Sequence, residues 1–240
     1  ESTLDLRERG APAGGAPQVS DRRLFVQVQA FGGCRDPEGV KAVLESRGVE
    51  GALYLDLHDP QGIGVLLLSE DPAWFVREGR AILNSRPLET LQRKPEFSMF
   101  GKTYAAGRES DRKERLLVRP RRCILNPEWP WAVWYPLRRN GEFALLSPDE
   151  QGAILAEHAK VGISYGQSGY AADIRLSCYG LDVHDNDFVI GLMGPDLHAL
   201  SRLVQDMRRS QQTARFVQSL GPFFVGRAVW HSRGPSASGR

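Results

Sequence analysis

The order in which β-prone and helix-prone segments alternate is the feature that most constrains the fold of this chain. Period-two alternation and short apolar runs are typical of strands, and an Asp-Pro pair is typical of the residues at which a helix begins. In the first half of the chain, these signals come in the order β-α-β-β-α-β. We predict strands at 24–31, 51–57, 62–68 and 99–105, and helices that begin at Asp36-Pro37 and Asp71-Pro72.

The second half repeats this order of elements, although not the residues themselves. Ser147 and Glu150 have the spacing of a capping box, which indicates the start of a long helix. The order β-α-β-β-α-β is the ferredoxin-like arrangement. We therefore predict an α+β fold of tandem ferredoxin-like repeats, the dimeric α+β barrel architecture, with helices outside and a pocket within. The predicted strands of this half lie at 131–137, 174–180, 187–193 and from 222 onward, and its second helix begins at Gly194-Pro195-Asp196.

These patterns divide the chain into four regions. Residues 1–20 contain a run rich in glycine, alanine and proline that cannot form a packed core alone, so we expect a flexible N-terminal arm. Residues 21–118 form the N-terminal ferredoxin-like half and residues 119–232 the C-terminal half. Residues 233–240 are expected to be a flexible tail.

Charge, hydropathy and cysteine content exclude several classes of protein. The net charge of +2 gives no global field that would favour nucleic acid or an anionic membrane. No apolar run approaches the roughly 20 residues that span a bilayer, and no signal peptide opens the sequence, so we expect a cytoplasmic protein. The cysteines Cys34, Cys123 and Cys178 are widely spaced, which indicates buried thiols rather than a zinc site or disulfides.

His158 has the most informative context among the five histidines. It lies on the helix that begins at Ser147, four residues after Ile154, and so faces the apolar side that packs on the sheet. Such a histidine is either a hydrogen-bonded core residue or a ligand. Haem iron suits it if its second ring nitrogen is hydrogen-bonded, and because Glu157 points elsewhere, that partner must come from another element.

Several motifs in residues 129–230 resemble those of the chlorite dismutase family of haem proteins. The strand 134–139, Trp-Tyr-Pro-Leu-Arg-Arg, is similar to the family's Tyr-Pro-hydrophobic-basic-basic strand. Glu157-His158 follows 23 residues after Tyr135, in the place of the family's helix-borne histidine. Tyr165, Gly180-Leu181-Asp182 and the closing strand also match in order and spacing.

The resemblance implies roles for individual residues. His158 would be the axial ligand of the iron, with Arg139 and Tyr165 also binding the porphyrin, Arg139 near a propionate. Tyr135 matches the tyrosine that acts as a radical in coproheme decarboxylases. From the residues alone, two alternatives stay open, a surface charge at a strand end for Arg139 and an ordinary core aromatic for Tyr135. Two basic clusters, 119–122 and 138–139, are typical of solvated surface, but a site for a carboxylate-rich ligand would also need them.

The distal side of the implied haem site departs from the family pattern. Chlorite dismutases carry an arginine thirteen residues after the histidine and many decarboxylases a glutamine, but here that position is Ala171. Alignment on the later Gly-Leu-Asp motif selects Asp173 instead. Ala171, Asp173 and Arg175 share one face of a predicted strand. Arg175 therefore either reaches the distal pocket as a catalytic residue or pairs with Asp173.

The leading hypothesis is an enzyme, a haem-dependent oxidoreductase resembling coproheme decarboxylase, which uses peroxide to convert coproheme to haem b. One alternative is a chlorite dismutase, which converts chlorite to chloride and dioxygen with Arg175 steering the reaction. Another is a haem-binding or haem-free oligomeric module without turnover. The implied cofactor is an iron porphyrin, haem b or coproheme, and the implied partners are a porphyrin substrate with peroxide or chlorite. The resemblance also implies a homo-oligomer, commonly a pentamer.

Overall fold

The first half of the chain forms the predicted β-α-β-β-α-β unit. The computed structural model describes residues 4–13, 16–107 and 109–233. Both helices begin where the Asp-Pro pairs predict, because Asp36 and Asp71 each accept a hydrogen bond from a backbone N–H of the first turn, both at 2.9 Å. The elements are β3 (Phe25–Gly32), α1 (Pro37–Ser46), β4 (Gly51–Asp56), β5 (Ile63–Ser69), the helical segment α2 (Pro72–Trp74), η1 (Phe75–Gly79) and α3 (Arg80–Leu83), a short turn η2 (Leu88–Thr90), and β6 (Gln92–Lys102).

The second half forms the same unit with additional short elements. The capping box is present, because Ser147 Oγ accepts from Glu150 N at 3.4 Å and Ser147 N donates to Glu150 Oε2 at 2.9 Å. It starts the longest helix of this half. The elements are β7 (Trp131–Arg139), α5 (Glu142–Leu145), α6 (Pro148–Gln167), β8 (Ala172–Ser177), β9 (Phe188–Gly194), α7 (Leu197–Met207), α8 (Gln211–Phe216), β10 (Val217–Leu220) and β11 (Phe224–His231).

Each half keeps the strand order of a ferredoxin-like sheet. The order is β4-β5-β3-β6 in the first half and β11-β7-β9-β8 in the second, so the first and third strands of each unit are central. Strand β11 pairs with β4, and β6 meets β8 at Lys102 and Ser177. Within the described residues, all strands of this nine-stranded sheet except β10 therefore form a closed ring. The predicted α+β fold of tandem ferredoxin-like repeats is confirmed.

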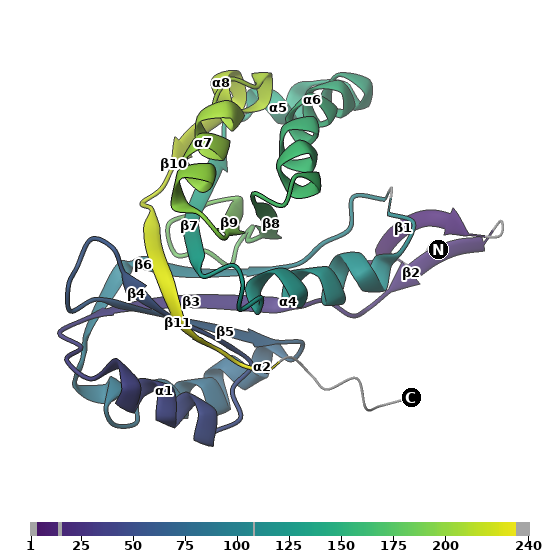
Figure 1. Ribbon diagram of the computed structural model, residues 1–240. Coiled ribbons are helices and arrows are strands. Elements are labelled where there is room, and N and C mark those ends of the chain that lie inside the picture. The colour runs from purple at the N-terminus through teal and green to yellow at the C-terminus, as the bar shows by residue number, and fades with distance from the viewer. Residues whose placement is uncertain (1–3, 14–15, 108, 234–240) are drawn as a thin grey trace.

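The inside of this ring is a packed core rather than a pocket. Trp134, Tyr54 and Phe224 are at most 1% exposed and fill it together with aliphatic side chains from both halves. Gly191 is required here, because a Cβ at this position would overlap the ring of Trp134. The helices of the two halves lie at opposite ends of the molecule, α1 and α2 at one and α6 to α8 at the other (Figure 1). The prediction of a pocket inside the barrel is thus wrong, and the space for a ligand lies outside the ring of strands.

A helix joins the two halves across the boundary expected at residues 118 and 119. It consists of η3 (Glu114–Val118) and α4 (Arg119–Ile124), which are continuous. Leu116, Leu117 and Ile124 from this linker helix are buried in the same core as the inner faces of the strands. The linker helix therefore packs on the barrel with its apolar residues, and its polar residues, such as Arg115 and Arg119, lie next to the second half.

The N-terminal region contains a hairpin where the composition predicted a flexible arm. Strands β1 (Glu8–Ala13) and β2 (Ala16–Ser20) pair in antiparallel orientation. Glu8 fastens this hairpin to the barrel, because its carboxylate lies 3.4 Å from Arg23 Nε and accepts from the backbone N–H of Ala105 at 2.9 Å. Charged contacts thus hold in place a segment whose composition cannot form a hydrophobic core of its own. Residues 1–3 and 14–15 of the predicted arm and 234–240 of the predicted tail lie outside the described residues.

The three cysteines are buried free thiols, as predicted. Among the residues the structure describes, no helix is long and apolar enough to cross a membrane.

Candidate functional site

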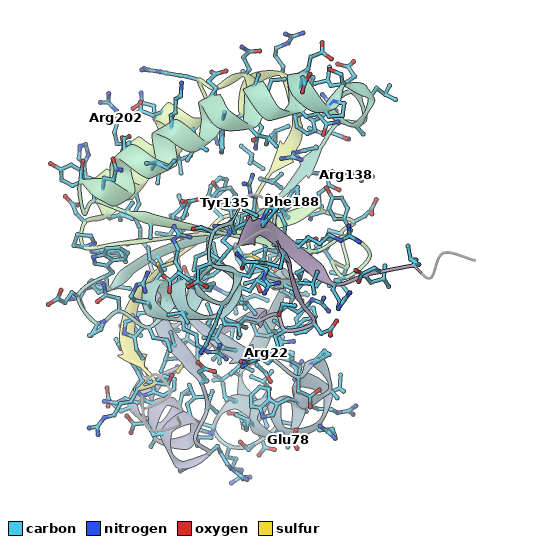
Figure 2. The ribbon with its side chains drawn as sticks, turned by 90° about the vertical axis from the view of Figure 1, so that its right-hand side faces the viewer. Arg22, Glu78, Tyr135, Arg138, Phe188 and Arg202 are labelled. Atoms are coloured by element: carbon cyan, nitrogen blue, oxygen red, sulfur yellow. The ribbon has the colours of Figure 1, made fainter. Side chains whose placement is uncertain are left out.

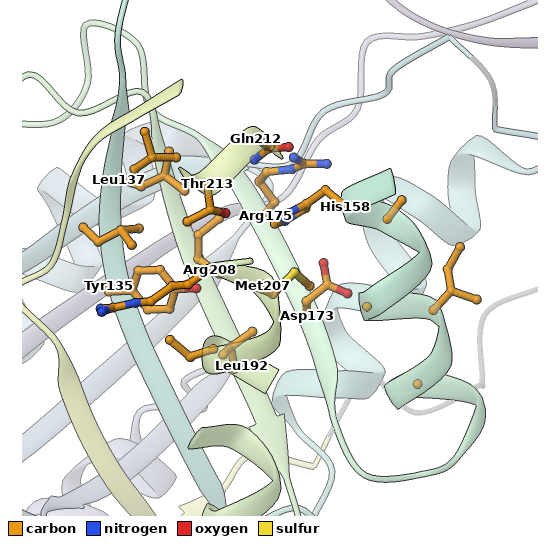
Figure 3. Close-up of a pocket in the computed structure, with 18 of the residues that line it drawn as sticks. Tyr135, Leu137, His158, Asp173, Arg175, Leu192, Met207, Arg208, Gln212 and Thr213 are labelled. Atoms are coloured by element: carbon orange, nitrogen blue, oxygen red, sulfur yellow. The ribbon is translucent and has the colours of Figure 1, made fainter. Parts of the chain in front are cut away.

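A cavity of about 490 Å³ lies between helices α6 and α7 and the outer face of the second half-sheet. Its volume is within the range of sites that bind cofactors and small molecules, about 300–1,000 Å³. Figure 2 shows Tyr135 and Phe188 beneath the long helix α6, and Figure 3 shows the side chains around the cavity. The sheet wall is largely apolar. It is formed by Leu137, Ile190 and Leu192 from the long strands and by Val217 and Leu220 from β10.

His158 projects from α6 into this cavity, as its position on the apolar side of the helix predicted (Figure 3). Its Nδ1 lies 2.8 Å from Ser210 Oγ, in the turn between α7 and α8, so the second nitrogen is engaged from another element. Glu157 points elsewhere and accepts from Gln211 N at 3.3 Å. Burial, reinforced by the positive charge of Arg175, lowers the pKa of His158 to about 4. The imidazole is therefore neutral near pH 7, the form that binds metals.

Tyr135 also lines the cavity, on the opposite wall from α6. The alternation of β7 places Trp134 in the barrel core and Tyr135 on the outer face. The ring is 7% exposed and stacks on Phe223 with 4.5 Å between centroids. Burial raises the pKa of this phenol, and the nearby Asp173 acts in the same direction, while Arg208 opposes them. Tyr135 is thus a neutral phenol held rigidly beside the cavity.

The outer face of β8 carries two of the three residues predicted for the distal side. Asp173 and Arg175 line the cavity, whereas Ala171 is fully buried and is not among the lining residues. Asp173 Oδ1 lies 3.7 Å from Arg119 Nη2, and Arg119 Nη1 donates to the backbone oxygen of Asp173 at 3.0 Å. Asp173 therefore pairs with the linker helix and not with Arg175. Arg175 keeps a buried Nε that has no hydrogen-bond partner among the described residues.

Arg139 is neither a surface charge nor a residue of the cavity wall. Its guanidinium carbon lies 4.3 Å from the ring centre of Phe143 and 4.8 Å from that of Phe188. Burial and the charge of Arg175 lower its pKa. The Nε of Arg139 is buried without a hydrogen-bond partner in the described part of the chain. The aromatic rings thus hold a partly buried cation, and Phe188 also contacts Arg175 of the cavity, whose guanidinium carbon lies 5.8 Å from the ring centre.

Tyr165 does not join the site that contains His158. Its hydroxyl donates to Asp206 Oδ2 at 2.7 Å, and its ring packs between α6 and α7. The prediction that Tyr165 binds the cofactor is not supported by this placement, because the residue is not among those that line the cavity. A separation of seven residues returns to nearly the same side of a helix, but the neighbouring helix α7 covers that side at Tyr165.

Arginines that the sequence did not single out as site residues complete the cavity. Arg115 and Arg119 reach it from the linker helix, and Arg208 from the end of α7. The basic cluster at 119–122 contributes only its first member, because Arg121 pairs with Glu50 and Arg122 with Glu114. The only sequence signal for these residues was the concentration of positive charge itself. The second predicted basic cluster, 138–139, contributes no lining residue, and Arg138 pairs with Asp185 at 2.7 Å.

These residues fit an iron porphyrin. No group of three or more potential metal-binding side chains occurs among the described residues, so a metal bound at His158 would need most of its ligands from outside the protein. A single imidazole suits an iron whose four equatorial ligands come from a porphyrin ring. The apolar sheet wall suits the faces of such a ring, and the arginines suit carboxylates at its edge. The unpartnered Nε of Arg175 is consistent with an anionic ligand that satisfies it.

Comparisons with known proteins identify a matching family model and several similar structures. A chlorite dismutase family model matches residues 79–229, which include part of the first half as well as the second. A heme-binding protein from Thermus thermophilus is 20% identical, with a TM-score of 0.68 and coverage of 86% of this chain and 91% of that one. The chlorite dismutase of Candidatus Nitrospira defluvii, solved with imidazole, is 15% identical, with a TM-score of 0.65 over 87% and 92%. A candidate chlorite dismutase of known structure is 16% identical, with a TM-score of 0.70 over 87% and 95%. A search of curated protein sequences gave no match.

Proposed function

The chain belongs to the chlorite dismutase family. We propose that it binds an iron porphyrin in the cavity between α6 and the sheet, where His158 would hold the iron. One observation carries this proposal. A neutral histidine, with its Nδ1 hydrogen-bonded to Ser210, faces a cavity of about 490 Å³ that has a largely apolar sheet wall and arginines around it. A metal-binding histidine almost always has such a partner on its second nitrogen, because the partner orients the ring and defines the tautomer.

The charges around the cavity favour a porphyrin that carries several carboxylates. Arg115, Arg119 and Arg175 lie together at a small recess that adjoins the cavity, whereas Arg208 acts on Tyr135. Guanidinium groups bind carboxylates through charge-assisted hydrogen bonds. Coproheme, with four propionates, uses more of these cations than haem b, which has two. We therefore take coproheme as the substrate and oxidative decarboxylation as the reaction.

In this reaction, each reacting propionate and one peroxide give a vinyl group, carbon dioxide and two waters, with one proton consumed. The bound iron porphyrin supplies the redox chemistry with peroxide. Tyr135 contributes a neutral phenol, because burial raises its pKa and disfavours the phenolate. A neutral phenol gives up an electron and a proton together and can then take a hydrogen atom from the propionate side chain. Arg208 holds the reacting carboxylate beside Tyr135.

Binding is tested by titrating the purified protein with hemin and with coproheme, and following the Soret band. His158→Ala should abolish or strongly shift the band, whereas His198→Ala, an exposed histidine on α7, should leave it unchanged. A wild-type protein that gives no Soret band altered by His158→Ala refutes the haem site. In that case the chain is a haem-free module.

Turnover is tested by incubating the coproheme complex with peroxide and measuring the porphyrin mass. The wild type should release two carbon dioxide molecules per porphyrin, and Tyr135→Phe should lose at least about 100-fold in rate, the scale of removing an essential catalytic group. Tyr165→Phe is the matched control, because it removes a phenol that lies outside the cavity. Unchanged coproheme with the wild type rules out the decarboxylase.

Chlorite conversion is the second candidate, and Arg175 is the observation that favours it. Its guanidinium lines the same cavity as His158 and has a free buried donor among the described residues, which suits a small anion. An oxygen electrode with added chlorite tests this activity, and Arg175→Ala should abolish it. A haem complex that is inactive with both peroxide and chlorite indicates a binding protein without turnover. Assembly into a homo-oligomer and cytoplasmic location stay predictions.

A further inference from the structure

Ser210 makes a hydrogen-bond pattern that its position at the start of a helix does not explain. It is the residue before α8, and its backbone oxygen accepts from Ala214 N at 2.9 Å as the helix begins. A serine at this place usually caps the helix by accepting a backbone N–H with its hydroxyl, which contributes about 1 kcal/mol. The Ser210 hydroxyl makes no such bond. Instead, the hydroxyl makes its shortest hydrogen bonds with groups outside α8.

The hydroxyl lies between His158 and a backbone carbonyl. Ser210 Oγ is 2.8 Å from His158 Nδ1 and 2.8 Å from the oxygen of Met207. A carbonyl oxygen only accepts, so the single hydroxyl proton goes to Met207. The Thr213 hydroxyl, at 3.4 Å, is a weaker neighbour and can itself donate to Ser210. Ser210 then has only lone pairs to offer His158, and Nδ1 must carry the ring proton.

We propose that Ser210 is a positioning residue that holds His158 in the Nδ1–H tautomer, because its own hydroxyl hydrogen is engaged in a hydrogen bond to the Met207 carbonyl, so that Nε2 keeps its lone pair for iron. This inference rests on the proposed haem site for its purpose, but the tautomer itself is a property of the protein alone. Ser210 is 4% exposed, so water does not readily replace it. The ring is therefore oriented by a buried, two-step chain of hydrogen bonds that ends on the backbone.

The partner of the axial histidine is thus an uncharged group. A carboxylate in this place would draw the Nδ1 proton away and make the ring more basic. A serine whose hydroxyl hydrogen is already bonded to a carbonyl accepts a hydrogen bond from Nδ1 without adding charge. His158 would accordingly bind iron as a neutral imidazole, which would donate less electron density to the metal than an imidazole paired with a carboxylate.

The tautomer is tested first, in protein prepared without porphyrin and labelled with nitrogen-15 in histidine. Nuclear magnetic resonance near neutral pH should show the Nδ1–H form of His158 in the wild type and in Ser210→Thr, which keeps a hydroxyl. Ser210→Ala should shift the ring toward the Nε2–H form. Ser164→Ala is the matched control, because Ser164 Oγ also donates to a carbonyl three residues earlier, at 2.8 Å, without contacting His158. A wild-type Nε2–H form, or an unchanged ring in Ser210→Ala, overturns the proposal.

The consequence for haem is tested with the same variants. Ser210→Ala should bind hemin about 10- to 100-fold more weakly, the usual effect of removing a partner of a metal ligand. Ser210→Thr should restore the affinity. Ser210→Asp should raise the iron–histidine stretching frequency in resonance Raman spectra of the ferrous protein, because it adds a carboxylate. Equal affinity and equal stretching frequency in all variants would show that Ser210 does not act on the iron. If the tautomer is as expected but hemin does not bind, the proposed function fails and the hydrogen-bond assignment stands.

Discussion

The two halves of the barrel share one topology but differ in what separates their helices from the sheet. In the first half, Leu44 of α1 and Phe75 and Ile82 of the following helical segment are buried against the outer face of the sheet. In the second half, α6 has 20 residues, of which only Ile154 is buried. His158 and Gly162 occupy the side of α6 that faces the sheet. The difference shows that a cavity arises in this fold where a helix lacks the large apolar side chains that close it onto the strands.

The largest expected effect is the loss of stability when a buried side chain is removed from the first half, whose helices pack closely on the sheet. Leu44→Ala should lower the free energy of unfolding by about 2–5 kcal/mol, because Leu44 is fully buried and its removal leaves a cavity. The counterpart in the second half, where the cavity lies, is Ile163→Ala on α6. This change should lower the free energy of unfolding by under about 1 kcal/mol, because Ile163 is 55% exposed at the cavity. Urea denaturation measures both. Equal losses would mean that the two helices are packed alike.

A smaller effect is the pH dependence of the free energy of unfolding that His158 causes in the second half. Burial lowers the pKa of His158 to about 4 from its ordinary 6.5. Between these values, the unfolded chain takes up a proton that the folded protein does not, so the free energy of unfolding falls as the pH is lowered through this interval. At about 1.4 kcal/mol per pKa unit, the loss reaches roughly 3 kcal/mol. The contribution is fully present above pH 6.5.

The matched variant for this measurement is His158→Gln in protein without porphyrin. His231 also has a pKa lowered by burial and acts in the same direction, so only the difference between wild type and variant isolates His158. The variant should lose stability less steeply with acid when both are unfolded in urea at a series of pH values. Parallel curves for the two proteins would show that His158 is not buried as a neutral group.

The smallest expected effect concerns two glycines on α6. A Cβ at Gly162 would lie 3.3 Å from Asp173 Oδ1 and from Met207 Cε, whereas at Gly166 the nearest atom is 3.7 Å away. Gly166→Ala should stabilise the helix by about 0.5–1 kcal/mol, because glycine loses more conformational freedom on folding. Gly162→Ala should gain less, since Asp173 must shift. Thermal unfolding compares them, and equal gains would show that α6 does not lie close to β8.

The sequence correctly predicted those elements whose start depends on contacts between residues close together in the chain. The capping box of Ser147 and Glu150 and the Asp-Pro helix starts form within one turn, so their spacing predicted the elements. The linker helix was missed, because Pro120 lies in its interior and proline argues against a helix there. The pairing of β1 with β2 was missed because Glu8 holds these strands to Arg23 and Lys102, and composition does not reveal such contacts.

The sequence by itself determined the repeated unit, the helix that carries His158 and the face of β8 shared by Asp173 and Arg175, because these follow from periods of 3.6 and 2 residues. The tertiary structure decided which groups meet there. Arg208 reaches the cavity from the end of α7, and Ser210, in the turn after α7, contacts His158. Arg119 reaches the cavity from the linker helix and pairs with Asp173, which therefore does not pair with Arg175. Tyr165, two turns from His158, is instead held by Asp206. These partners are distant in the chain, and only closure of the barrel and packing of α7 on α6 bring them together.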